Sequence, residues 1–90
     1  MTVNYDELPP HMRQGAKLYV EQGVVPGGFM VAVLSDNLAD AFVKADSVNK
    51  AAMEQWAQWL LDDAPWDCWG SYDRIDKWVK LGGLEGDGNE

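Results

Sequence analysis

Apolar residues recur at helical spacing through most of this 90-residue chain. The first such segment follows Pro9 and Pro10, which suit a helix start because their missing N–H groups have no intrahelical acceptor there. It stops before Gly23, a residue type that readily adopts the left-handed conformation found at helix ends. One face of the segment is apolar, with residues three or four positions apart: Met12, Ala16, Tyr19 and Val20. The pattern predicts a helix over 10–22.

The second apolar segment, Phe29–Leu34, is a continuous run that periodicity alone cannot assign. Its β-branched residues permit a short buried strand. No other segment has the alternation of a strand, however, and a single strand cannot satisfy its backbone hydrogen bonds. We therefore expect a short, deeply buried helix here, and keep a short buried extended segment at 29–34 as the alternative.

Capping signals begin two further helices. The cluster Ser35–Asn37 can cap a helix over 36–45, and Asp46 can cap the longest helix of the chain, over 46–63, which Pro65 terminates. The apolar stripe of the longer helix is wide, so this helix should be central. The two apolar faces comprise Leu38, Ala41, Phe42 and Ala45 in the first, and Val48, Ala52, Trp56, Trp59 and Leu60 in the second.

The last helix is predicted after Ser71 and ends at the pair Gly82-Gly83. Residues 84–90 are rich in glycine and acids and predict a flexible acidic tail. The pattern as a whole predicts a single all-α domain over 1–83, a compact bundle of four or five short helices. Its predicted core contains Tyr19, Phe29, Leu34, Leu38, Phe42, Trp56, Trp59, Leu60, Ile75, Trp78 and Val79.

The charge of the chain narrows the class of partner. Fifteen acidic residues against seven basic ones give a formal net charge of −8, and ten of the acids lie in residues 46–90. Proteins that bind nucleic acids directly neutralise phosphates with clustered lysine and arginine, and anionic membrane surfaces attract the same residues. The composition therefore disfavours direct nucleic-acid binding and membrane docking, and it favours a partner with a basic surface.

Few residues could carry catalysis or bind a metal. His11 is the only histidine and has no nucleophile beside it in the sequence. Cys68 is the only cysteine, which excludes an intramolecular disulfide, and its tryptophan neighbours are typical of a small buried side chain. The glycine clusters match no phosphate-binding loop. We therefore expect no catalytic residue, no cofactor and no metal ion, and thus a protein that is not an enzyme.

The segment that follows the longest predicted helix combines acids with two tryptophans. The acids lack the ligand spacing of a calcium loop, and a solvated acidic surface is their simpler interpretation. Trp66 and Trp69 either cover the end of the core or anchor a protein contact, since tryptophan often dominates the energy of interfaces. The residues that we assign to partner binding are Asp62, Asp63, Trp66, Asp67, Trp69, Asp73 and Asp76.

Short motifs are spread over about residues 8–80: Leu8-Pro9 with Met12-Arg13 and Ala16, Pro26-Gly27-Gly28-Phe29, Leu34-Ser35-Asp36-Asn37-Leu38, Asp46 with Asn49, and Cys68-Trp69-Gly70-Ser71 with Trp78. Together, and at this chain length, they resemble a group of short accessory proteins of temperate phages and prophages. The resemblance carries no residue roles. It implies a context in which such proteins bind host proteins, including components of antiviral defence such as CRISPR-type complexes.

These observations lead to one expected function and one alternative. We expect a phage or prophage interaction protein that binds and inhibits a host protein, such as a nucleic-acid-handling complex, through its acidic surface. The alternative is a structural or regulatory phage accessory that self-assembles, so a homo-oligomer stays open. The first residues lack the basic and apolar segments of a secretion signal, and we expect the protein in the cytoplasm of the host cell.

Overall fold

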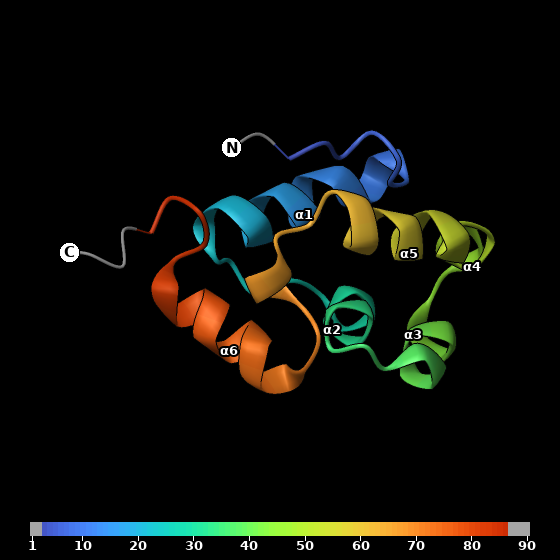
Figure 1. Ribbon diagram of the computed structural model, residues 1–90. Helices are drawn as coiled ribbons and strands as arrows, with labels where there is room; N and C mark the ends of the chain where they lie inside the picture. The colour runs from blue at the N-terminus through green and yellow to red at the C-terminus, as the bar shows by residue number, and fades with distance from the viewer. Residues whose placement is uncertain (1–2, 87–90) are drawn as a thin grey trace.

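Residues 3–86 of the computed structural model contain six α-helices and one short 3-10 helix, and no strand (Figure 1). In chain order these are α1 (Pro10–Gln22), α2 (Gly28–Leu34), α3 (Leu38–Lys44), α4 (Ser47–Ala51), α5 (Met53–Asp62), η1 (Trp66–Cys68) and α6 (Tyr72–Leu81). In the view of Figure 1, α1, α4 and α5 occupy the upper part, and α2, α3 and α6 lie below them. The predicted all-α fold is confirmed, and residues 29–34 belong to helix α2 rather than to an extended segment.

Helix α1 begins and ends where the sequence signals place it. Its first residue is Pro10, and Gly23 ends it with a left-handed φ of 70°. The chain returns to this end after α6, where the backbone N–H groups of Leu84 and Glu85 donate to carbonyls of the last α1 turn at 2.9 and 2.8 Å. The first residues of the predicted tail are therefore hydrogen-bonded to α1. Residues 87–90 of the predicted tail lie outside the described residues.

The long helix predicted after Asp46 is interrupted at Ala52, so that it forms α4 and α5. The Asp46 carboxylate caps α4 as predicted and accepts the backbone N–H of Asn49 at 2.7 Å. The N–H of Ala52 is shared between the carbonyls of Val48 and Asn49, each at 3.1 Å, which is the tightened turn of a 3-10 helix. This break gives six α-helices where four or five were expected.

Large aromatic side chains fill the centre of the core. Trp56 and Trp59 are fully buried and pack edge to face, with ring centroids 6.1 Å apart, and Phe29 meets Trp56 in the same way at 5.4 Å. The indole N–H groups of Trp56, Trp59 and Trp78 all donate hydrogen bonds, as burial requires. Val79 is half-buried. The predicted core residues that are buried are Tyr19, Phe29, Leu34, Trp56, Trp59, Leu60, Ile75 and Trp78.

Two residues that were predicted to lie in the core are at the surface. Leu38 is 65% exposed and Phe42 is 43% exposed, so their assignment to the core is wrong. Helix α3 has only seven residues and packs against α2, with the small side chain of Ala41 buried. Because Ala41 makes this contact, the larger Leu38 and Phe42 remain beside it, where they line a groove shared with α5.

Candidate functional site

Trp66 is the most exposed aromatic side chain described in the chain, at 69%. It begins η1, the single 3-10 turn that follows Pro65. Its ring stacks on that of Trp69, with centroids 5.9 Å apart and an angle of 16° between the planes. Trp69 is itself half-buried. The pair therefore presents one large flat ring to solvent while the other supports it from below.

The backbone around the two tryptophans is fixed from three directions. The Arg74 guanidinium donates to the carbonyls of Trp66 at 3.1 Å and Trp69 at 3.4 Å. The Gly70 N–H donates to the carbonyl of Leu34 in α2 at 2.7 Å, and the Tyr19 hydroxyl in α1 donates to the carbonyl of Cys68 at 2.6 Å. Because these bonds involve α1, α2 and α6, the backbone that carries the two rings is held in place.

The sequence-predicted acids do not form one continuous cluster around this ring. Asp67 lines a pocket of about 330 Å³ together with the cations Arg74 and Lys77, which offset its charge. Asp73 and Asp76 line a different groove, beside apolar residues of α2 and α6. Within residues 3–86, no three His, Cys, Asp or Glu side chains are placed to hold a metal ion. The predicted site is therefore one aromatic surface with separate acidic groups near it in the chain.

The remaining two predicted acids lie at the end of α5, where Asp62 accepts a hydrogen bond from Gln58 and Asp63 follows the last helical residue. Here the structure adds Glu7, which the sequence did not single out. A hydrogen bond to the Asp63 carboxyl group raises the pKa of Glu7, as do partial burial and the charges of Asp63 and Asp62. One carboxyl oxygen of Glu7, Oε1, is buried without a hydrogen-bond partner. These three acids therefore form a negative group in which like charges repel one another.

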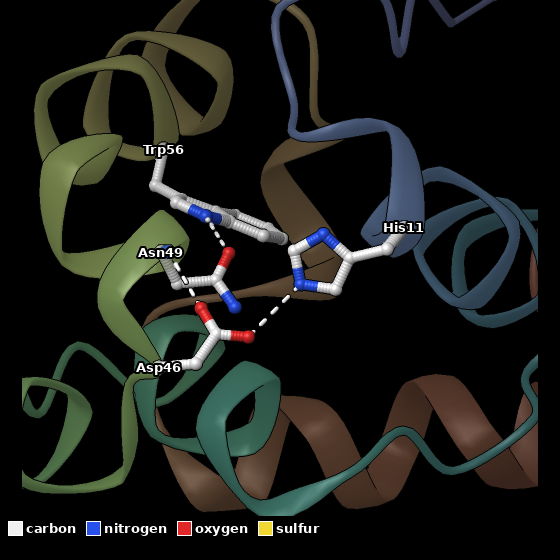
Figure 2. Close-up of polar contacts among 4 residues, drawn as sticks. All are labelled: His11, Asp46, Asn49 and Trp56. Carbon is white, nitrogen blue, oxygen red and sulfur yellow. Dashed lines mark hydrogen bonds and ion pairs between the residues drawn. The ribbon is translucent and has the colours of Figure 1, made fainter.

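His11 lies in a chain of polar contacts that the sequence did not predict (Figure 2). Its Nε2 is 3.0 Å from Oδ2 of Asp46, whose other oxygen caps α4 through the N–H of Asn49. The Asn49 side chain in turn accepts the indole N–H of Trp56 at 3.1 Å. These contacts cap α4 and join it to α1 and α5, and no hydroxyl or thiol takes part in them. His11 therefore has a structural role, because its contact with Asp46 connects α1 to the start of α4.

Cys68 is fully buried and is the centre of no reactive group. Burial raises the pKa of its thiol to about 12, so the thiolate that would be needed for nucleophilic attack is disfavoured at neutral pH. Its backbone carbonyl accepts the Tyr19 hydroxyl, which makes the residue part of the packing beneath η1. The geometry supports the interpretation of Cys68 as a small core side chain.

Sequence reasoning missed an apolar groove of about 270 Å³ between α3 and α5. The helical spacing of Leu38 and Phe42 indicated an apolar face, but that face was predicted to point into the core. The groove is lined by Val33, Asp36, Asn37, Leu38, Ala41, Phe42, Met53, Glu54, Trp56, Ala57 and Leu60.

Comparisons of the chain with protein families, curated proteins and solved structures gave no match. The interpretation of its surfaces therefore depends on their own geometry and chemistry. In the part of the chain that the structure describes, no helix combines the length and the apolar character needed to cross a membrane.

Proposed function

We propose that this chain is a non-catalytic interaction protein of phage or prophage origin that binds and inhibits a host protein. The observation that carries the proposal is the exposure of Trp66, which stacks on Trp69 in a loop that hydrogen bonds connect to three helices. A tryptophan ring that is left in water forgoes the favourable burial of a large apolar surface. Such a ring on a fixed backbone is what a protein contact uses as an anchor.

The fixed backbone of this surface favours a role in binding over a role as a cover for the end of the core. Ordering a side chain or loop on association costs free energy, and a surface that is ordered in advance avoids this cost. The bonds from Arg74 to the carbonyls of Trp66 and Trp69 provide that order here. A tryptophan that only covered the end of the core would be expected to lie against it, as Trp78 does.

Charge supports a partner with a basic surface. The net charge of −8 attracts basic proteins over several ångströms and accelerates their encounter more than it strengthens the final complex. Surfaces that handle nucleic acids are basic, so a host-defence complex, for example of the CRISPR type, is the partner class that we propose. Arg74 and Lys77 lie beside Asp67, and Lys80 forms an ion pair with Asp76 at 3.1 Å. The attraction therefore depends on Asp62, Asp63 and Asp73 more than on Asp67 and Asp76.

Affinity capture from host-cell lysate with the tagged chain at low and moderate salt tests the proposal. We expect the wild-type chain to capture one stoichiometric partner with a basic surface. The amount captured should fall as the salt concentration rises, and Trp66→Ala should capture none. Val48→Ala is the matched control, because Val48 is also exposed but lies on α4. Capture that is equal for Trp66→Ala and wild type would contradict the proposal. A defined homo-oligomer in light scattering, with no host partner, would instead favour the self-assembling accessory protein.

A further inference from the structure

The groove between α3 and α5 is a second, chemically different surface of the molecule. Eight of its eleven lining residues are apolar, and they come from α2, α3 and α5. Leu38 and Phe42 stand one helical turn apart along one wall, 65% and 43% exposed. None of the lining residues belongs to the surface around Trp66, so the two surfaces can be tested separately.

Two helices form walls of the groove. One wall is α3, which extends for about 10 Å at 1.5 Å per residue, and the other is the stretch of α5 from Met53 to Leu60, about two turns long. A partner helix lying between two such walls would place apolar residues at i, i+3 or i+4, and i+7 into the groove. The large side chains at the rim would then be covered on the side that now faces water.

The charges at the groove decide which kind of helix it would take. The two charged residues that line it, Asp36 and Glu54, are both acidic, and no lysine or arginine of the described residues is among the lining side chains. The nearby cation Lys44 is held by Asp40 at 2.7 Å. A second copy of this chain would bring another net charge of −8 to an acidic rim, and like charges oppose such an association.

We propose that the α3–α5 groove docks an amphipathic helix of a partner protein whose polar face is basic. Leu38 and Phe42 contact the apolar face of that helix, and Asp36 and Glu54 pair with lysine or arginine residues on its flanks. The proposal adds a docking site to the proposed function and does not depend on Trp66.

The probe for this site is a fluorescent leucine–lysine peptide of about 18 residues, five helical turns, with leucine at the i, i+3/i+4 and i+7 positions. A peptide of the same composition in scrambled order and a leucine–glutamate peptide with the same apolar positions serve as controls. Fluorescence anisotropy with the wild-type chain is expected to show saturable binding of the leucine–lysine helix alone. In nuclear magnetic resonance spectra of the protein, addition of this peptide should shift the backbone signals of Met53 and Ala57. Equal binding of the scrambled peptide, or no saturable binding, would overturn the proposal.

Two pairs of variants assign the contacts. Leu38→Ser with Phe42→Ser is expected to weaken peptide binding about tenfold or more, as truncation of central interface residues does, whereas Val43→Ser, also on α3 but outside the lining, should change it less than about twofold. Asp36→Asn with Glu54→Gln should weaken binding and reduce its salt dependence. Asp6→Asn with Glu85→Gln makes the same charge change elsewhere on the exposed surface.

The charge pairs and the oligomeric state give the remaining outcomes. Equal losses from the two charge pairs would show that only the net charge matters, and would refute the groove as the site. Light scattering of the wild-type chain alone is expected to show a monomer. A dimer that Leu38→Ser with Phe42→Ser dissociates would assign the groove to a second copy of the chain instead.

Discussion

Nε2 of His11 and Oδ2 of Asp46 lie 3.0 Å apart, although 35 positions separate the two residues in the sequence. Figure 2 shows Asp46 between His11 on one side and Asn49 on the other. One carboxylate thus caps α4 and at the same time ties this helix to the first turn of α1. Both side chains are about half exposed, so the pair is a surface contact whose main role is to fix the start of α4.

The substitution Asp46→Ala should lower the melting temperature more than Asp46→Asn, because asparagine retains an acceptor for the Asn49 N–H. That hydrogen bond, followed by His11, lowers the pKa of Asp46 below its ordinary value of 3.8. A lowered pKa contributes stability above pH 3.8 that is lost as pH falls through the folded-state pKa. The difference between wild type and Asp46→Asn should therefore shrink below about pH 3.8. Thermal unfolding at several pH values measures it, and a difference that stays constant would contradict this account.

The hydrogen bond from Trp56 to Asn49 predicts a larger effect, because both side chains are buried. Asn49→Ala leaves the indole N–H without an acceptor and should lower the free energy of unfolding by about 1–3 kcal/mol. Urea denaturation followed by circular dichroism gives the value. In a double-mutant cycle, Trp56→Phe with Asn49→Ala should show coupling between the two sites. Strict additivity of the two single changes would mean that the hydrogen bond does not contribute to stability.

The sequence predicted the positions of the helices better than it predicted which side of each helix is buried. Apolar spacing gives one face of a helix, and for α1 and α6 most of that face is buried. For α3 the same spacing selected Leu38 and Phe42, which are exposed, because the buried contact with α2 is made by Ala41. A seven-residue helix has two turns, so a single small residue can decide which side meets the core.

The candidate site was predictable in its residues but not in its arrangement. Pro65 and Ser71 predicted a loop that contains Trp66 and Trp69. The structure places both residues between α5 and α6, with Trp66 as the first residue of η1 and Trp69 as the residue that follows it. The position of Glu7 beside Asp63 depends on the packing of segments that are far apart in the sequence. Arg74 is close to the loop in the sequence, but the apolar spacing does not show where its side chain donates. The same spacing continues across Ala52 and does not mark the break there.

The acids Glu7, Asp62 and Asp63 predict a stability that depends on pH. The pKa of Glu7 is raised, so folding favours its protonated form; this favourable contribution is present at low pH and is lost as pH rises through the folded-state value. Glu7→Gln removes the repulsion and should raise the melting temperature at pH 7, with little effect near pH 3.5, where wild-type Glu7 is largely protonated. Asp6→Asn, which makes the same charge change at the exposed neighbouring residue, is the control. Equal effects of both variants at both pH values would contradict a specific role of Glu7.

The return of the chain to α1 predicts a contrast between two glycines. Gly83 has a φ of 72°, and a Cβ there would lie 2.6 Å from the backbone N of Gln22, which cannot move without disturbing the end of α1. Gly83→Ala should therefore lower the free energy of unfolding by more than about 1 kcal/mol. A Cβ at Gly27 would meet nothing within 4 Å, and alanine can adopt its φ of −70°. Gly27→Ala should therefore cost less than Gly83→Ala, although alanine is the weaker N-cap. Urea denaturation compares the two variants, and hydrogen exchange should show faster exchange of the Leu84 amide in Gly83→Ala. Equal stability of the two variants would mean that the contact between the chain end and α1 contributes little to the fold.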